Sequence, residues 1–396
     1  MWITKDIGKQ KMAFLLSTLF SFLIVATRSA AQVTPPLIVF GDSTVDTGNN
    51  NYINTTEDFL ANFPPFGKDY FDKPTGRFSN GRVYVDFICE YAGRPHVSPY
   101  LEPGADHSKG VNFASGGSGV LDETNQGMAM SLKAQLQNFV NFEDGLIEKW
   151  GTDLAKKYFS DAIYLVSLAN NDYMGGYFAK QELQQKYTPQ EFLALVVSDV
   201  VKACEFLRSK GARKMVVAGV GPLGCIPAVR ALHPAQECFE QGTQMAVAHN
   251  MALAMALKDW ASHHQEMTVL IADFLTYMTE RQDNPTAFGL SNGAGACCGN
   301  TAPCGRKDPT TGADYSLCSN AHEYVYWDAF HSTEIIAQGW SKEIWDGPNA
   351  SRFISPMNLR TLFELSSAHD DEEVAELETY AGGSTKTIEK IDPTVL

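Results

Sequence analysis

The sequence is short of positive charge, with 31 Lys and Arg residues against 46 Asp and Glu in 396 residues. The net charge of −15 argues against a general nucleic-acid-binding protein, because contacts to phosphates need clustered Lys and Arg side chains. Part of the acidic excess lies at the C-terminus, where residues 366–396 contain eight acidic and two basic side chains. We therefore predict an acidic, flexible tail over 366–396.

The chain also lacks an apolar run long enough to span a bilayer. Its longest run, Met12–Ala26, is shorter than the roughly 20 residues that a transmembrane helix needs. This run follows three lysines, and small residues at Ser29–Ala31 offer a cleavage site. That pattern predicts a secretory signal peptide over 1–31 rather than a membrane anchor, so that the mature chain has no transmembrane segment and is extracellular.

Two common nucleotide and hydrolase motifs are missing. There is no Walker A sequence, and Val45 occupies the place of the second glycine that a G-x-S-x-G elbow around Ser43 would need. Gly219–Gly224 matches G-x-G-x-x-G, but Pro222 and Pro227 obstruct the helix that would have to begin inside it. We interpret this motif as a rigid turn and predict no nucleotide cofactor.

The eight cysteines lack the paired Cys-x-x-Cys spacing of a zinc site, and for a secreted chain we favour disulfides. Cys225 and Cys238 flank a loop that contains proline, and a Gly/Pro/Asn-rich region holds Cys297, Cys298, Cys304 and Cys318. A zinc site built from the last three is the alternative, and the pairing is open. We expect Cys89 and Cys204 to be buried thiols.

The neighbouring histidines His263 and His264 are expected to lie on the surface in contact with water, and no metal is predicted.

Apolar runs and helical patterns alternate along the chain about five times. Buried strands are predicted over 37–40, 111–115, 161–168, 214–220 and 267–274. Helices are predicted over 83–91, 132–159 with a break at Gly151, 189–210, 236–264 and 333–345. This alternation predicts an α/β fold with three α/β/α layers and a mainly parallel, flavodoxin-like sheet of about five strands. Without a clear linker, we assign 32–365 to one domain.

Four polar or glycine-containing segments follow predicted strands or lie in late loops, and parallel strands bring such ends to one edge. Ser43 follows the first strand. Asp328 and His331 are three residues apart, so the carboxylate can accept a hydrogen bond from Nδ1 and leave Nε2 to take a proton from a serine. Asn171 and Gly119 are candidate donors to an oxyanion.

The sequence around these residues resembles the GDSL-type SGNH hydrolases, specifically the plant-type GDSL esterase/lipases. The resemblance covers about residues 36–365. It is carried by Gly41-Asp42-Ser43, by Asn112–Gly119 (NFASGGSG), by Asn171-Asp172 and by Asp328-x-x-His331. The segments Gly221–Pro227 and Cys297-Cys298-Gly299 also fit, and the blocks occur in the order of the family.

The resemblance implies roles for the candidate residues. Ser43 would be the nucleophile, His331 the general base and Asp328 its orienting acid. The oxyanion hole would consist of the Ser43 N–H, a glycine N–H and the Asn171 side chain. We favour Gly119 as that glycine, with Gly117 as the competing choice.

One position departs from the family pattern. The family usually has glycine where this chain has Ala169, so we expect the added methyl group to affect the loop that carries Asn171.

The function expected from this resemblance is that of a secreted serine esterase or lipase. It would hydrolyse carboxylic esters of lipid or other small-molecule substrates through an acyl-enzyme, without a cofactor, and in a plant it would act in the cell wall or apoplast. Two alternatives stay open: an acyltransferase that uses the same triad, and a non-catalytic lipid- or glycan-binding relative. Sequons at Asn54 and Asn349 would be glycosylated in a secreted chain.

Overall fold

The computed structural model describes residues 34–299, 303–307 and 312–367. The predicted signal peptide, 1–31, and nearly all of the predicted tail, 366–396, lie outside the described residues. Within the described part, Pro35–Ser366 form one compact unit. The predicted domain boundaries at 32 and 365 stay predictions.

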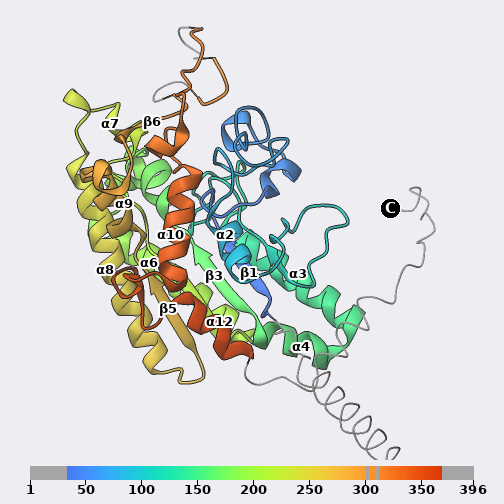
Figure 1. The fold of residues 1–396 in the computed structure, drawn as a ribbon. Coiled ribbons are helices and arrows are strands. Elements are labelled where there is room, and N and C mark those ends of the chain that lie inside the picture. The colour runs from blue at the N-terminus through green and yellow to red at the C-terminus, as the bar shows by residue number, and fades with distance from the viewer. Residues whose placement is uncertain (1–33, 300–302, 308–311, 368–396) are drawn as a thin grey trace, which may run out of the picture. The chain divides into compact units, whose positions relative to one another are not determined.

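A six-stranded sheet lies at the centre of this unit (Figure 1). Its strands, in spatial order, are β2 (Gly110–Asn112), β1 (Leu37–Gly41), β3 (Ile163–Ser167), β4 (Lys214–Ala218), β5 (Thr268–Ala272) and β8 (Ile354–Ser355). The first five run parallel and β8 is antiparallel to β5. The predicted mainly parallel sheet is confirmed. The two residues of β8 are too few to give a sequence signal.

The strands are buried on both faces, which explains their nearly continuous apolar sequences. In β1, Ile38 and Phe40 pack into one hydrophobic cluster, while Leu37 and Val39 pack into the other. All four side chains are at most 1% exposed. The alternation follows from the two-residue period of a strand, so each face of the sheet needs its own layer of helices.

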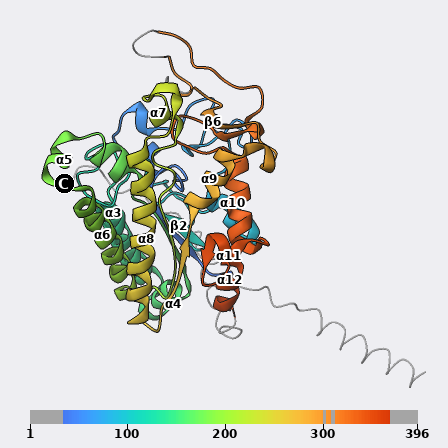
Figure 2. The same cartoon turned by 90° about the vertical axis from the view of Figure 1, so that its left-hand side faces the viewer.

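Two helical layers cover these faces, as predicted (Figures 1 and 2). The first cluster is completed by α3 (Leu132–Trp150), α4 (Thr152–Asp161), α6 (Pro189–Ser209) and α8 (Glu240–Ser262). The second is completed by α2 (Tyr84–Tyr91), α9 (Phe274–Asp283), α10 (Glu334–Asp346), α11 (Ala350–Phe353) and α12 (Leu359–Ser367). The predicted break at Gly151 is present, with φ 86°.

The remaining elements are short and lie in the connections between strands and helices. They are η1 (Asn49–Tyr52), η2 (Glu57–Phe59), η3 (Asp172–Tyr177), α5 (Gln181–Lys186), α7 (Pro227–Arg230), η4 (Pro234–Gln236), η5 (Pro285–Phe288), η6 (Ala321–Glu323), and a small sheet of β6 (Asn292–Ala296) and β7 (Tyr324–Tyr326). α8 begins four residues later than predicted, because Ala235 and Gln236 have φ values of 54° and 55°, outside the helical region.

Disulfides are present as predicted, and the structure supplies the pairing. The bonds join Cys225 to Cys238, Cys297 to Cys318 and Cys298 to Cys304. Cys89 and Cys204 are buried free thiols. Among the described residues, no three or more His, Cys, Asp and Glu side chains are grouped so as to hold a metal ion.

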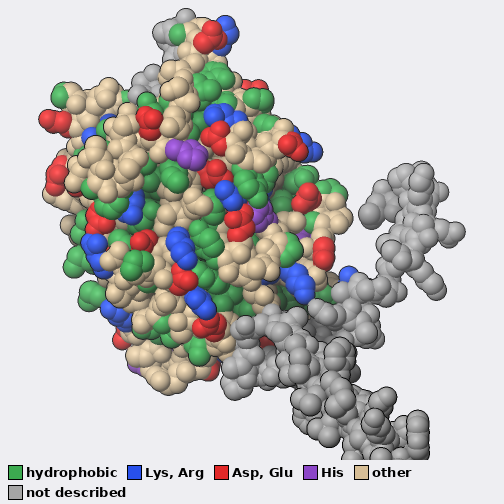
Figure 3. Space-filling model, in the orientation of Figure 1, with side chains coloured by type: hydrophobic (Ala, Val, Ile, Leu, Met, Phe, Trp, Pro, Cys, Tyr) green, Lys and Arg blue, Asp and Glu red, His purple; other side chains and the backbone are tan. Residues whose placement is uncertain are grey.

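The described part contains no membrane-spanning helix, and one face of its surface shows mixed charge. None of its helices is long and apolar enough to cross a bilayer. On the face drawn in Figure 3, Lys and Arg side chains are scattered among Asp and Glu side chains. The absence of a nucleic-acid partner stays a prediction.

Candidate active site

The carboxyl ends of β1, β2 and β3 meet at one edge of the sheet, and their loops hold most of the predicted site residues. The backbone extends the strand pairing beyond β1: the Asp42 N–H donates to the Ser167 carbonyl at 3.1 Å, and the Ser115 N–H donates to the Gly41 carbonyl at 3.0 Å. Ser43 follows directly and is 8% exposed. The first turn after β1 is therefore fixed to both neighbouring strand ends.

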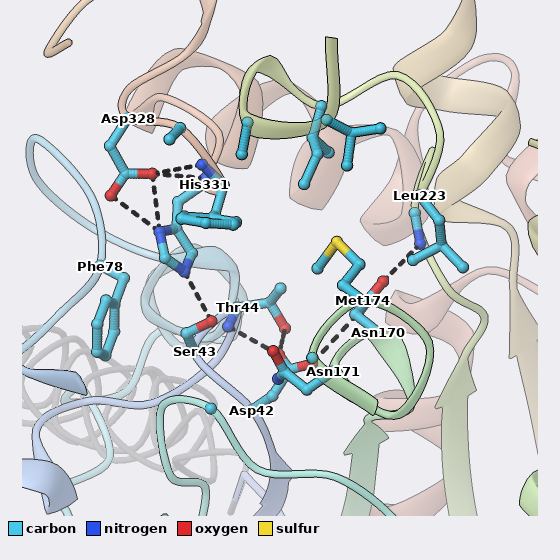
Figure 4. A pocket seen from close by; sticks show the side chains of 18 of the residues that line it. Asp42, Ser43, Thr44, Phe78, Asn170, Asn171, Met174, Leu223, Asp328 and His331 are labelled. Atoms are coloured by element: carbon cyan, nitrogen blue, oxygen red, sulfur yellow. Dashed lines mark hydrogen bonds and ion pairs between the residues drawn. The ribbon is translucent and has the colours of Figure 1, made fainter. Parts of the chain in front are cut away.

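Ser43, His331 and Asp328 form a continuous chain of hydrogen bonds (Figure 4). Ser43 Oγ lies 2.7 Å from His331 Nε2, and His331 Nδ1 lies 2.9 Å from each oxygen of Asp328. Because the carboxylate can only accept, Nδ1 carries the proton and Nε2 is free to accept from the serine. This is the geometry of a nucleophile, a base and an orienting acid.

The segment that carries His331 is held by residues just before and within α2. The ring of Phe78 lies against His331 with centroids 5.0 Å apart. Tyr84 Oη is 2.6 Å from Ser332 Oγ, the residue after the histidine. Two residues further on, the Glu334 carboxylate accepts from Arg82 Nε at 2.6 Å. The imidazole is therefore restrained from a second part of the chain, about 250 residues away in sequence.

Asn171 lies beyond the end of β3 and lines the same cavity as Ser43. Its Nδ2 donates to the Ser118 carbonyl at 2.9 Å, which leaves the second hydrogen of that amide for another acceptor. Ala169, two residues before, is fully buried with φ 92°, a backbone conformation that favours glycine. The turn thus keeps the shape that a glycine would allow, at a cost in backbone strain.

The two candidate glycines occupy different environments. A Cβ atom on Gly119 would lie 2.5 Å from the Thr124 side chain and 2.6 Å from Asp172 Oδ1, and Gly119 is not among the residues that line the cavity. Gly117 does line the cavity together with Ser43 and Asn171. Across the described ranges, no hydrogen bond takes up the N–H of either glycine. Gly117 therefore lies on the cavity wall with Ser43 and Asn171, whereas the favoured Gly119 packs against Thr124 and Asp172.

Two buried carboxylates hold the glycine-rich loop between β2 and α3. Asp46 accepts from the N–H groups of Gly48, Asn49 and Gly116. Asp172, next to Asn171, accepts from Val120 N, Leu121 N and Thr124 Oγ1 at 2.8, 3.0 and 2.6 Å. Burial raises the pKa of each to about 6, although these hydrogen bonds oppose the shift. The loop that presents Gly117 is thus fixed on both sides.

Asp42 and Asn170 belong to the site, although sequence reasoning assigned them no role. Asn170 Nδ2 donates to Asp42 Oδ2 at 3.2 Å, and its Oδ1 accepts from the Gly221 N–H at 3.0 Å (Figure 4). Burial raises the pKa of Asp42, opposed by hydrogen bonds from Thr44 and Asn170 and by the nearby His331. The glycine-rich motif after β4 is therefore a turn tied to the site, with no helix beginning at its glycines.

A cavity of about 1280 Å³ opens in front of Ser43. This is larger than the range of about 300–1,000 Å³ typical of small-molecule sites. Besides the site residues, its walls are mainly apolar and include Phe59, Leu60, Phe63, Phe66, Phe78, Met174, Tyr177, Phe178, Leu223, Ile226, Val229, Leu232, Phe239, Phe274 and Met278. Such a volume suits a substrate with an extended hydrocarbon part.

Comparison with known proteins gives a consistent result. The profile of a family described as GDSL-like lipase/acylhydrolase matches residues 37–344. A GDSL lipase of Tanacetum cinerariifolium is 36% identical over 335 residues, which cover 85% of this chain and 89% of that protein. GDSL esterase/lipase 5 of Arabidopsis thaliana is 35% identical over 370 residues, or 89% of this chain and 94% of that protein.

Proposed function

This chain belongs to the GDSL lipase/acylhydrolase family, whose members are carboxylic ester hydrolases, and from this premise we propose that it hydrolyses lipid-like esters with Ser43 as nucleophile. The observation that carries the proposal is the hydrogen-bond chain from Ser43 through His331 to Asp328, with distances of 2.7 and 2.9 Å, at the base of an apolar cavity. Its volume favours a long acyl chain over a small acid.

The reaction proceeds through an acyl-enzyme. Ser43 Oγ attacks the ester carbonyl carbon while His331 Nε2 takes its proton, and Asp328 stabilises the imidazolium that forms. The tetrahedral intermediate collapses as His331 returns the proton to the departing alcohol. Water, activated by the same histidine, then attacks the acyl-enzyme, and Ser43 leaves with a proton from His331.

The negative charge on the tetrahedral oxygen requires donors aimed at the Ser43 side of the cavity. We assign this role to the Ser43 N–H, the Gly117 N–H and Asn171 Nδ2. Gly117 replaces Gly119 in this assignment, because Gly117 lines the cavity with Ser43 and Asn171 whereas Gly119 does not. Asp46 and Asp172 position these donors without touching the substrate.

Secretion is part of the proposal. The three disulfides among the described residues support it, since such bonds persist in oxidising compartments. Asn54 and Asn349, the two sequon asparagines, are both exposed and therefore accessible to glycosylation.

Hydrolysis of p-nitrophenyl butyrate tests the proposed nucleophile. Ser43→Ala should lower kcat by about 10⁶, because the covalent route is removed. Ser262→Ala, at an exposed serine near the end of α8, is the matched control and should leave kcat unchanged. Near-full activity of Ser43→Ala would refute the assignment.

A further inference from the structure

The segment between Cys225 and Cys238 is a closed loop at the cavity, and its helix α7 lies at the upper end of the molecule in Figures 1 and 2. The disulfide joins its two ends. Within the loop, Arg230 Nε donates to the Cys225 carbonyl at 2.9 Å and Nη1 donates to the Gln236 carbonyl at 3.1 Å. The base of the loop is fixed to the histidine segment, where the Ala228 N–H donates to the Ala329 carbonyl at 2.9 Å. These bonds restrain the loop tip.

The tip of this loop is uncharged and exposed. Residues 231–236 (Ala-Leu-His-Pro-Ala-Gln) contain no Asp, Glu, Lys or Arg, and all of them except His233 are exposed. Leu232 is 82% exposed, the highest value among the large apolar side chains that the structure describes. His233 stacks on Phe239 with ring centroids 5.1 Å apart. A restrained loop that holds a leucine in water is a candidate for contact with an apolar partner.

The same apolar surface continues to the catalytic residues. Leu232, Val229 and Ala228 of the loop line the cavity that contains Ser43. Phe330, which precedes His331, is 54% exposed and lines the cavity too. An apolar chain leaving a surface that covers Leu232 would therefore meet Val229 and Phe330 in the cavity that contains Ser43.

The charge at the mouth indicates what kind of surface fits. Arg306, which lines the cavity, pairs with Asp58 at 2.8 Å and with Glu57 at 3.5 Å. Arg82, the other Lys or Arg residue among the described ones that line the cavity, pairs with Glu90 and Glu334, and the net charge of −15 opposes anionic headgroups. A lipid surface without net charge fits this mouth better than an anionic one.

We propose that the tip around Leu232, together with Phe330, docks onto a zwitterionic lipid surface, from which the acyl chain passes into the cavity. This inference rests on the proposed function only in that the lipid whose acyl chain enters the cavity is the ester that Ser43 attacks. Docking itself requires no turnover, so it can be tested in a protein that cannot hydrolyse the lipid.

Sedimentation with phosphatidylcholine vesicles, in the full chain carrying Ser43→Ala, is the test. Adding Leu232→Ser and Phe330→Ser should lower the partition coefficient at least about tenfold, because two apolar side chains no longer enter the lipid. Adding Met251→Ser and Met255→Ser instead should change it less than about twofold. These methionines are 63% and 71% exposed on α8 and do not line the cavity.

A second pair of variants tests the docking surface if the variant with Leu232→Ser and Phe330→Ser does not fold. Leu232→Trp should be quenched by brominated phosphatidylcholine vesicles, whereas Met251→Trp should not. Absence of vesicle binding, equal binding by all variants, or a dimer that depends on Leu232 would overturn the docking proposal. Vesicle binding by a protein whose wild type hydrolyses no ester would refute the proposed function alone.

Discussion

The catalytic edge of the sheet and the mouth of the cavity are built by opposite means. At the edge, polar side chains are buried and hydrogen-bonded: Asp46 and Asp172 each accept three hydrogen bonds and are fully buried. At the mouth, apolar side chains such as Leu232 are exposed on a loop closed by a disulfide. Substitutions at the edge should therefore be costly, because each buried polar group needs its hydrogen-bond partner. Substitutions at the mouth should instead change the shape of the cavity and so the substrates that it accepts.

After loss of the nucleophile itself, the most damaging change at the edge should be Asp328→Asn. An amide in this place presents hydrogens as well as an oxygen, so His331 is no longer held in the tautomer that accepts from Ser43. We expect kcat on a soluble ester to fall by about 10⁴ with little change in KM. Steady-state kinetics measures this. A loss below tenfold would show that Asp328 does not orient the base.

Asn171→Ala should have the next largest effect. Removal of one oxyanion donor costs a factor of about 10²–10³ in kcat. The comparison with Asn125→Ala is informative, because Asn125 also lines the cavity but donates to the Gly117 carbonyl at 2.8 Å. We expect the smaller loss for Asn125→Ala, through displacement of the loop. Equal losses of kcat in the two variants would mean that Asn171, like Asn125, acts by supporting the loop and not as an oxyanion donor.

The pH dependence of stability tests whether the buried imidazole of His249, which contacts Tyr173 next to the site, can be protonated in the folded protein. His249 is fully buried, its Nδ1 lies 2.7 Å from Tyr173 Oη, and burial lowers its pKa to about 4. The unfolded chain, with a histidine pKa near 6.5, binds more protons than the folded chain between pH 4 and 6.5, so stability rises with pH in this window.

Relative to His249→Gln, which does not titrate, the wild type should therefore lose about 2 kcal/mol between pH 7 and pH 5. Urea unfolding of both proteins at the two pH values gives this difference. A difference that stays the same at pH 5 and pH 7 would mean that the imidazole takes up its proton without unfolding.

At the mouth, a larger side chain should alter selectivity without removing the chemistry. Val229→Trp, on the wall formed by the disulfide-closed loop, should lower kcat/KM for a long-chain ester about tenfold more than for an acetate ester. Val247→Trp, on the exposed side of α8, serves as the control. Equal effects on both esters would place the acyl chain elsewhere.

The smallest effect concerns the strained turn before Asn171. Ala169→Gly should stabilise the protein by up to about 1 kcal/mol, because glycine adopts φ 92° without the Cβ penalty although it gains more entropy on unfolding. Thermal unfolding measures the change. A destabilised variant would show that packing of the buried methyl group outweighs the backbone strain.

The sequence predicts the sheet and its edge well because their signals are local. Apolar runs such as Leu37–Phe40 and Ile163–Val166 form the centres of the strands, and Ser43 and Asn171 come a few residues after these two runs. Asp328 and His331 are recognisable because their spacing of three residues itself permits the hydrogen bond.

Other features depend on contacts between distant segments and are not visible in the sequence. Gly117 and Gly119 are two residues apart, and only the structure places Gly119 against Thr124 and Asp172 and Gly117 on the cavity wall. Asn170 gives no signal, because its partners Asp42 and Gly221 follow other strands. The cavity wall from Cys225 to Cys238 depends on a disulfide whose pairing the sequence leaves open.

Mass spectrometry of the protein after reaction with a fluorophosphonate bearing an alkyl chain tests the central claim most directly. We expect one adduct, on the peptide that contains Ser43, and slower labelling in His331→Ala because the serine has lost its base. An adduct on another residue, or no adduct while ester hydrolysis continues, would contradict the assignment of Ser43 as the nucleophile.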